Sequence, residues 1–540
     1  MTAIRLALRL GQWGLIGFAV VGFVFTFINA AGFYAVAGHT QAEREAFANS
    51  FAQIAAQLTV LLPPAMRLDT VGGYTQYRAY GSLVIVFSIW ALASATGAAR
   101  GNEERGLADV ILATGLSRVR FVATHVAAFA IASFVAALAS SAGLMVGAIA
   151  GQESFPIGPA IEAAVVLTAV AVACYSLAFL VAQLVAQRMA TGVAGVALLA
   201  LFLLNSLSRT FDSLHTLRWL SPFRYYELSR PLPPGGNFDV PATLLLVGVA
   251  IVATGLAAVA FTRRDLGSAL FVFRASARPP TYEPSGALVL RIPIIRDLYD
   301  RRVGLATWAA GVSAMAALFV VLTKTIVQPL LSIPGLAAYF AAIMHGPIYQ
   351  SFLSAIWFGF AQLLMAGFAI TQVARWSAED TDGRLELILS NPVSRTRVVI
   401  ERAVVLALGA VVIAAVSGVA VSVESHYQSI DLDAGRVAEA SLMLVPFTLV
   451  FAAIGALLAA RLPRATVGIL GIFAFASYLM LQIGPLFKLP DWVQNLSAFK
   501  LYGQPLTDGV DRPGLAIMLA IVLVGFWASA IVMQRRDIGA

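Results

Sequence analysis

The chain has 540 residues, of which 59% are hydrophobic and only 12% are charged, with a formal net charge of +8. Soluble proteins have roughly a quarter of their residues charged, so this composition excludes an ordinary soluble domain and indicates a polytopic membrane protein. The single cysteine, Cys174, lies in an apolar run, which excludes an internal disulfide and any metal site built from several cysteines.

Twelve apolar runs are about long enough, at roughly 18 residues or more, to cross a bilayer as helices. The predicted spans lie near residues 11–37, 82–99, 121–150, 160–187, 190–206 and 241–262, and then near 302–324, 353–375, 399–423, 439–460, 465–485 and 514–533. The first run is longer than the roughly 7–15-residue core of a signal peptide and lacks a convincing cleavage site, so we expect it to remain as a membrane helix. The predicted fold is therefore an all-α polytopic membrane protein with twelve transmembrane helices.

Arginines set the expected orientation. They gather before the first span, after the second, between the sixth and seventh and at the end of the chain, whereas the alternate loops are mostly neutral or acidic. Because cytoplasmic loops carry an excess of Lys and Arg, we expect both termini to be cytoplasmic. The basic residues share no common face, so no nucleic-acid partner is expected.

The spans form two sets of six that read as a tandem repeat. Residues 220–226 (LSPFRYY) reappear as 496–502 (LSAFKLY), and residues 261–267 (FTRRDLG) match 533–539 (MQRRDIG). Repeats with an even number of spans are parallel, which predicts a pseudo-dimer with a central path. The predicted domains are residues 1–262, a cytoplasmic linker of residues 263–301, and residues 302–540.

A polar stretch follows the second span of each repeat, at residues 103–120 and 380–397. Each copy has an acidic start that suits a helix dipole, a glycine, an apolar centre and a Ser-Arg-x-Arg exit. The apolar residues recur at i, i+3 and i+4, which predicts an amphipathic helix of roughly 16 residues. Recurrence in both repeats favours a surface for a partner protein, and a helix held only by membrane lipid is the alternative.

The polar stretch closely resembles the coupling region of ABC-2-type exporter permeases, whose usual form is close to Glu-x-Gly-x-Leu-Glu-x-Leu-Leu-x-x-Pro-Val-Ser-Arg. The second copy matches almost position by position, whereas the first has Gly115 where the family has the proline found here as Pro392. The fused twelve-span layout is similar to actinobacterial multidrug and polyketide-antibiotic exporters of the tetronasin-resistance type, which implies a bacterial inner membrane as the location. The resemblance implies two repeats of the type V ABC exporter kind, with unequal docking surfaces.

The resemblance further implies that an ABC ATPase subunit, in two copies, docks on the two polar stretches. The expected coupling residues are Glu103, Glu104, Gly106, Leu107, Val110, Ile111, Leu112 and Arg118, and then Asp380, Asp382, Gly383, Leu385, Glu386, Ile388, Leu389, Pro392 and Arg395. The sequence contains no phosphate-binding Walker A motif, so ATP and Mg²⁺ would bind on the partner. We therefore expect this chain to hold no cofactor and not to be an enzyme by itself.

The cargo path is less clearly marked. The family resemblance places an external gate at the repeated Leu-Ser-x-Phe element, with residues Pro222, Phe223, Tyr226, Phe499 and Tyr502. Polar or aromatic residues within spans are the candidates for a path, and they are Phe87, Trp90, Asn205, Trp357, Phe360 and Gln362. They suit an amphipathic or hydrophobic small molecule, such as a drug, an antibiotic or a lipid-like compound. Gly143, Gly147 and Gly151 predict a close helix–helix contact.

Two other classes remain as alternatives. A proton-coupled secondary multidrug transporter of the major facilitator kind also has twelve spans in parallel halves. The middle of the spans, however, contains almost no ionisable residue to mark a proton route. A membrane enzyme is the third possibility, but no paired His, Asp or Glu lies on one helix face. The preferred interpretation is the permease subunit of an ATP-driven exporter.

Overall fold

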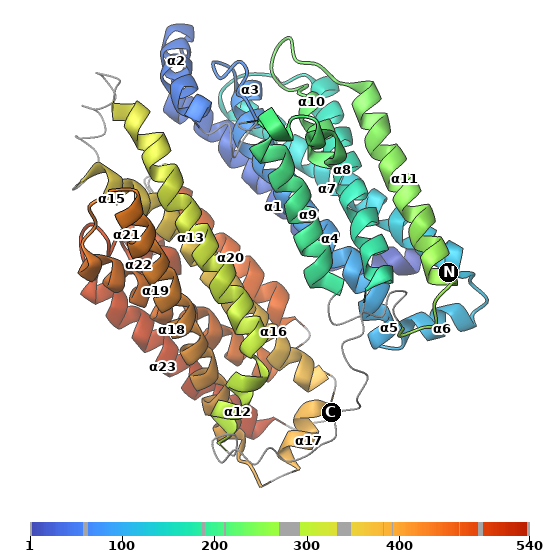
Figure 1. Cartoon of the computed structure of the whole chain (residues 1–540), viewed down its shortest axis with the longest axis vertical. Helices are drawn as coiled ribbons and strands as arrows, with labels where there is room; N and C mark the ends of the chain where they lie inside the picture. The colour runs from blue at the N-terminus through green and yellow to red at the C-terminus, as the bar shows by residue number, and fades with distance from the viewer. Residues whose placement is uncertain are drawn as a thin grey trace. The chain divides into compact units, whose positions relative to one another are not determined.

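The computed structural model describes residues 3–57, 63–185, 190–209, 212–268, 292–331, 347–381, 383–390, 392–463, 465–483 and 490–536. Within these ranges the backbone is almost wholly helical, and the β-structure is one isolated antiparallel bridge between Arg230 and Asn237 (Figure 1). The chain divides into two compact units, Met1–Pro279 and Pro280–Ala540. The predicted fold class, an all-α polytopic membrane protein, is confirmed.

The first unit contains six helices that are long and apolar enough to cross a membrane. They are α1 (Ala3–Ala37), the segment Val71–Glu104, α7 (Arg118–Ala150), α8 (Ile157–Leu184), α9 (Ala190–Leu207) and α11 (Val240–Thr262). Helix α8 lies at the centre and contacts α7, α9 and α11, and α1 packs along α7. The shorter helices α2 (Gln41–Gln57) and α10 (Pro222–Leu228) join these spans.

The second unit contains five helices of spanning length. They are α13 (Arg302–Leu331), the segment Ile348–Thr381, α18 (Arg395–Tyr427), α19 (Ala434–Arg461) and α23 (Arg512–Arg535). The span predicted near 465–485 corresponds to α20 (Thr466–Ile483), whose apolar part is shorter than in the other spans. The described residues therefore hold eleven helices of spanning length plus this shorter one. The described residues of this unit also form short helices, among them α12 (Pro293–Asp300), α21 (Asp491–Gln494) and α22 (Ala498–Tyr502).

The second span of each unit contains π-helical turns, which are rare and often lie near functional sites. In the first unit, α3 (Val71–Thr75), a π turn at Gln76–Tyr80, α4 (Gly81–Thr96), a π turn at Gly97–Gly101 and α5 (Asn102–Glu104) form one continuous helix. In the second unit, α15 (Ile348–Leu353) and a π turn at Ser354–Phe358 lead into α16 (Gly359–Thr381). The first π turn is thus present in both units, whereas α16 is regular in the region that corresponds to Gly97–Gly101.

Small residues hold α1 and α7 in close contact. A Cβ atom on Gly143 would lie 2.2 Å from the carbonyl oxygen of Phe23. A Cβ atom on Gly147 would lie 2.6 Å from the Cβ atom of Ala30. Neither position accepts a side chain without moving α1. The predicted close approach of another helix to this glycine run is confirmed.

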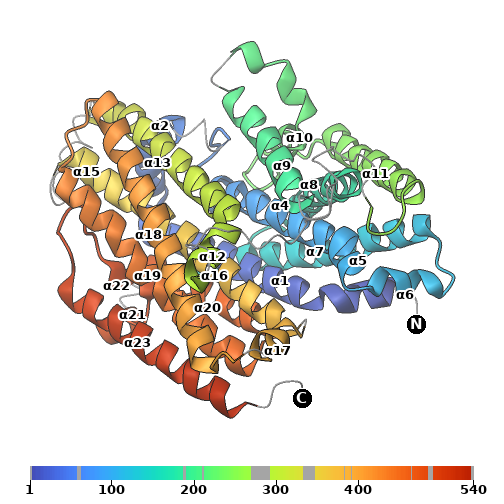
Figure 2. The same cartoon turned by 60° about the horizontal axis from the view of Figure 1, so that its bottom comes forward.

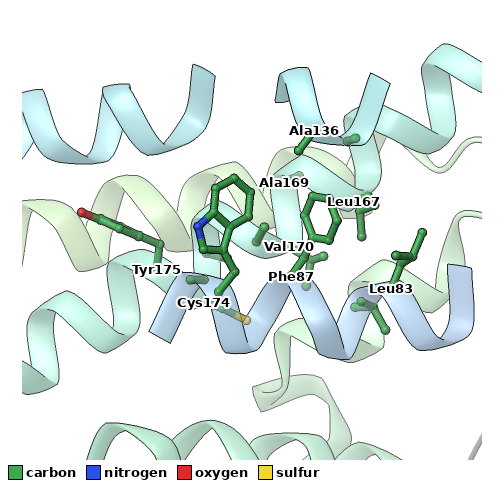
Figure 3. Packing of buried hydrophobic residues seen from close by; sticks show 14 of the residues in the cluster. Leu83, Phe87, Ala136, Leu167, Ala169, Val170, Cys174 and Tyr175 are labelled. Carbon is green, nitrogen blue, oxygen red and sulfur yellow. The ribbon is translucent and has the colours of Figure 1, made fainter. Parts of the chain in front are cut away.

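The core of the first unit lies where α4, α7 and α8 meet. Figure 3 shows Leu83 and Phe87 of α4 beside Leu167 and Cys174 of α8, with Ala136 of α7 next to them. Each of these side chains is at most 1% exposed. Cys174 is therefore a small core residue, as its apolar neighbours in the sequence indicate.

Candidate functional site

The polar stretch after the second span folds into a short helix in each unit, α6 (Leu107–Ala113) and α17 (Arg384–Leu389). Gly106 and Gly383 precede these helices with φ angles of +69° and +72°. Glycine adopts this left-handed conformation without steric cost, so the chain changes direction there. The predicted helix of roughly 16 residues is wrong in length, because the two helices have only 7 and 6 residues. Asp382 lies outside the described residues.

The serine of the Ser-Arg-x-Arg exit begins the third span of each unit. The Ser117 hydroxyl oxygen accepts a hydrogen bond from the Arg120 N–H at 3.3 Å, at the start of α7. The Ser394 hydroxyl oxygen accepts one from the Arg397 N–H, also at 3.3 Å, at the start of α18. Serine is a preferred residue at this position because its oxygen satisfies an unpaired N–H of the first turn.

The first arginine of the exit binds the end of the sixth span. Arg118 donates hydrogen bonds to the carbonyl oxygens of Phe261 at 2.9 Å and Arg264 at 2.5 Å. In the second unit, Arg395 donates to the carbonyl oxygens of Met533 at 2.8 Å and Arg536 at 2.5 Å. The carbonyl groups at the end of a helix lack partners within the helix and attract cations. The repeated motif therefore joins the start of the third span to the end of the sixth in both units.

Glu103 lies in a buried ion cluster. Its carboxylate accepts hydrogen bonds from Arg100 at 3.1 Å and from Arg264 at 3.0 Å. The three side chains are each at most 3% exposed. The backbone N–H of Gly267 donates a further bond to the same carboxylate at 3.2 Å. Glu103 thus pairs with buried cations and does not face the dipole of α6 as the sequence suggested, since a buried carboxylate requires such partners.

The same cluster includes the end of the fourth span. Arg100 donates to the carbonyl oxygens of Ala182 at 2.6 Å and Val185 at 2.7 Å. Arg264 donates to the side-chain oxygen of Gln183 at 2.8 Å. The ends of the second, fourth and sixth spans therefore meet around the Glu103 carboxylate. We call this end of each unit the arginine-rich end, marked by Arg100 and Arg264 in the first unit and by Arg395 and Arg536 in the second.

The second unit has a weaker version of this cluster. Asp380 replaces Glu103 and forms an ion pair with Arg536, and these side chains are 11% and 27% exposed. Three residues before the carboxylate, where the first unit has Arg100, the second has Ser377. The Ser377 hydroxyl is buried and has no hydrogen-bond partner among the described residues. In the part of the chain that the structure describes, the ion pair of Asp380 is therefore with Arg536, whereas Glu103 pairs with both Arg100 and Arg264.

Helices α6 and α17 bury one face against their own unit. Ile111 and Leu112 pack on the core of the first unit, and Leu385 and Leu389 pack on a small cluster in the second. Part of the predicted docking stripe therefore faces inward. Leu107 is half-buried, whereas Glu104, Ile388 and Pro392 are exposed.

The outward faces of α6 and α17 present an apolar residue after an acidic one. Val110 is 66% exposed and follows the exposed Asp109, and Leu387 is 70% exposed and follows the exposed Glu386. The two pairs occupy the same position in the two copies of the stretch. Periodicity assigns Val110 to the apolar stripe of the first copy, but the structure places it on the outward face. Periodicity did not single out Leu387 or Asp109, because neither belongs to the stripe of its copy. Recurrence of an acidic–apolar pair at the same position in both copies is the signal that marks them.

A family profile described as the C-terminal domain of the multidrug efflux system permease Rv1217c matches residues 1–262 and 298–533. The matched segments make up well over half of the chain and include both polar stretches. The chain belongs to this multidrug efflux permease family. A comparison of the sequence with curated proteins found no match.

The predicted gate residues of the permease lie in α10 and α22, at the opposite end of each unit from α6 and α17 (Figure 1, Figure 2). All five are buried: Pro222, Phe223, Tyr226, Phe499 and Tyr502. The serine that precedes each helix donates to the fifth span, from Ser221 to the Leu201 carbonyl oxygen at 2.8 Å and from Ser497 to the Ser477 carbonyl oxygen at 2.6 Å. This short helix is therefore attached to the fifth span in the same way in both units.

The two gate tyrosines bind different spans. Tyr226 donates its hydroxyl proton to the carbonyl oxygen of Tyr80 in the shared π turn at 3.0 Å. Tyr502 donates to the carbonyl oxygen of Ala440 in α19 at 2.7 Å. Burial raises the pKa of both phenols above the usual range, which keeps them neutral and able to donate.

The predicted path residues of the permease are scattered within the two units. Phe87 packs edge to face on Trp90 with ring centroids 5.7 Å apart, and Trp90 lines a cavity. Asn205 donates to Glu227 at 2.7 Å near the end of α9. Trp357 and Gln362 are buried in the second unit, whereas Phe360 is 41% exposed. The structure thus brings Phe87 and Trp90 into direct contact, and it places Trp357 and Phe360 against the same ring of Phe319, at 5.9 and 5.3 Å between centroids.

Among the described residues of the permease, no group of three or more His, Cys, Asp and Glu side chains is placed to hold a metal ion.

Proposed function

We propose that the permease is the membrane-spanning subunit of an ATP-driven ABC exporter that moves amphipathic or hydrophobic small molecules out of the cell. A separate ATPase subunit, in two copies, supplies the energy by binding α6 and α17. The observation that carries this proposal is that both helices expose an apolar residue while an ion pair joins the base of each helix to the sixth span of its unit. At α6 the ion pair is buried and its cluster also includes the end of the fourth span. The arginine-rich end is the cytoplasmic end, in keeping with the positive-inside rule.

The exposed pairs suit a protein partner. A large apolar side chain on a rigid element is the kind of residue that becomes a hot spot when a partner covers it. The neighbouring carboxylates of Asp109 and Glu386 favour a partner with basic groups around an apolar pocket. Such a surface on each repeat fits two copies of one ATPase subunit.

The contacts at the base of α6 can transmit a displacement of this helix to the ends of α8 and α11. Glu103 and Arg118 join the beginning and the end of this stretch to the same carboxyl end of α11, and Arg100 joins it to α8. Separating a buried ion pair costs about 3–5 kcal/mol, so a displacement of α6 moves these span ends with it. ATP binding drives transport if it favours one arrangement of the spans over another, since a ligand shifts an equilibrium only through differential affinity.

Charge substitution on the outward faces tests the proposal. The permease with Val110→Asp and Leu387→Asp is co-expressed with a candidate ABC ATPase subunit that co-purifies with the wild type, and co-purification and ATP hydrolysis in nanodiscs are measured. Loss of one hot-spot residue costs about 2 kcal/mol, so we expect ATPase binding to weaken by about thirtyfold or more. Both positions are exposed, so the thermal unfolding temperature of the permease alone should remain unchanged.

Val303→Asp is the matched control, because Val303 is 70% exposed at the start of α13 and lies outside both polar stretches. This variant should bind the ATPase as the wild type does. If the Val110→Asp/Leu387→Asp permease retained normal ATPase binding and hydrolysis, α6 and α17 would not be the docking elements.

A further inference from the structure

A cavity of about 300 Å³ lies inside the first unit, between α1, α4, α7 and α8. Its volume is at the lower end of the range of roughly 300–1,000 Å³ that is typical of small-molecule sites. Gly97 and Ala98 of the second π turn form part of its wall, as does Gly11 of α1. The cavity lies close to the arginine-rich end, since Asn102 and Arg105 also line it.

One wall of the cavity is aromatic. Trp90, Phe129 and Tyr175 come from three different helices and all line the space. The ring centroids of Trp90 and Phe129 are 4.9 Å apart, and those of Phe129 and Tyr175 are 4.4 Å apart and stacked. Phe18 stacks on Trp90 at 4.6 Å. Aromatic faces of this kind favour a planar apolar group by stacking.

The other wall is a chain of polar groups. Arg105 donates to the Asn102 side-chain oxygen at 3.0 Å, and the Asn102 amide lies 3.4 Å from Nε2 of His125. Nδ1 of His125 lies 2.9 Å from the Phe121 carbonyl oxygen, which fixes Nδ1–H as the donor and leaves Nε2 to accept from Asn102.

The charged groups around the cavity favour an anionic ligand. No carboxylate lines it, and Arg105 forms no ion pair among the residues that the structure describes. Arg105 is exposed, so its guanidinium lies at the mouth with donors available. A guanidinium recognises a carboxylate through two parallel hydrogen bonds.

The second unit lacks these features at the corresponding positions. The spacing that relates Glu103 to Asp380 places Gly367, Leu406 and Ala452 where the first unit has Trp90, Phe129 and Tyr175. The same spacing replaces the Asn102–His125 contact with an ion pair between Glu379 and Arg402. The aromatic and polar walls are therefore specific to the first unit and are not a by-product of the repeat.

We propose that this cavity binds a small amphipathic anion, with an aromatic ring against Trp90, Phe129 and Tyr175 and a carboxylate at Arg105. The binding site lies within the first repeat. The claim that such an anion is a cargo of the exporter rests on the proposed function, whereas the binding itself does not.

Direct binding tests the proposal with the permease alone in nanodiscs, without ATPase. The probes are 2-naphthylacetate, its neutral amide and the cationic 2-naphthylethylamine, which share a ring system and differ in charge. Isothermal titration should give the tightest binding for the anion. Decanoate, with the same head group on an acyl chain, separates an aromatic ligand from membrane fatty acids and should bind more weakly than 2-naphthylacetate.

Three variants locate the binding. Arg105→Gln should weaken the anion about tenfold and leave the amide unchanged, because a hydrogen bond to a charged group is lost. Arg120→Gln, which removes an exposed charge from the same end outside the cavity, should have no effect. Gly11→Leu should block all three naphthyl probes without unfolding the protein, because a Cβ atom there has no neighbour within 4 Å.

The cavity proposal is overturned if the anion and the amide bind equally, if Arg105→Gln matches Arg120→Gln, or if Gly11→Leu leaves binding intact. Decanoate binding as tightly as 2-naphthylacetate overturns the aromatic class. None of these results affects docking of the ATPase on α6 and α17, which is measured separately. Normal ATPase docking by the Val110→Asp/Leu387→Asp permease, together with binding of 2-naphthylacetate, would overturn the proposed docking and leave the binding site.

Discussion

Replacement of Glu103 by glutamine removes the one carboxylate of the buried cluster at the arginine-rich end of the first unit. The side chains of Arg100 and Arg264 then remain buried, at 3% and 1% exposure, without a counter-charge. Glutamine retains one oxygen that accepts hydrogen bonds, but it is uncharged and cannot neutralise either guanidinium. Breaking a buried pair by removing one partner costs about 3–5 kcal/mol, and we expect the first unit to lose about 3 kcal/mol.

The second unit and an exposed pair provide graded controls. Asp380→Asn removes a carboxylate whose partner, Arg536, is 27% exposed, so water compensates and we expect a loss of about 1–2 kcal/mol. Glu401→Gln removes an exposed helical pair with Arg397, which is 54% exposed, and we expect at most about 0.5 kcal/mol. Unfolding of each variant is followed in detergent micelles by SDS titration, with tryptophan fluorescence and circular dichroism as readouts.

The expected order of destabilisation is Glu103→Gln, then Asp380→Asn, then Glu401→Gln. A loss for Glu103→Gln no larger than that for Glu401→Gln would refute the reasoning. The cluster would then not hold the ends of the second, fourth and sixth spans together, and the transmission of a displacement from α6 would lose its basis.

Two further variants test the packing of the first unit. Gly147→Ala should destabilise it by about 1–3 kcal/mol, because the new Cβ atom would lie 2.6 Å from the Cβ atom of Ala30. Gly158→Ala should stabilise it by about 0.5–1 kcal/mol in the same micelle titration, because a Cβ atom there has no neighbour within 4 Å. If both variants changed the unfolding free energy in the same direction, the packing argument would be wrong. Tyr226→Phe should cost about 1 kcal/mol at neutral pH through its lost hydrogen bond. Burial raises the folded-state pKa of Tyr226 above the unfolded value of about 10, so its contribution is complete below that pH and is lost above it. Tyr226→Phe should therefore flatten the fall in stability above pH of about 10, and an unchanged alkaline slope would show that Tyr226 does not cause it.

Hydropathy and repeated motifs are sufficient to predict most of this fold. A bilayer requires about 20 consecutive apolar residues per span, a strong local signal that locates each long helix. The shorter apolar part of α20 is the exception. The ends are less well placed, since α1 begins at Ala3 and the second span at Val71, well before the predicted starts near residues 11 and 82. The spacing of glycines in α7 likewise predicts its contact with α1, because only side-chain size is needed to infer it.

Contacts between distant residues cannot be inferred from such local patterns. Glu103 and Arg264 are separated by 161 residues, and no local pattern indicates that one pairs with the other. The acidic start of the polar stretch resembles a helix-dipole feature because the burial of Glu103 depends on where α8 and α11 end. Periodicity finds the apolar stripe of α17 but not its direction, so it does not identify Leu387. It does not identify the cavity either, since the aromatic wall combines residues from three helices.

The surplus positive charge beside Glu103 makes the ion pairs of the two units respond differently to ionic strength. One carboxylate faces two guanidinium groups, and the remaining charge of Arg100 is stabilised by carbonyl oxygens at the negative end of α8. Neither contact is open to mobile ions. The Asp380–Arg536 pair is partly open to solvent, and ions screen such pairs over a Debye length of about 8–10 Å. Raising the ionic strength should therefore loosen the connection in the second unit and leave that of the first intact, which separates the two repeats in the wild-type protein without a mutation.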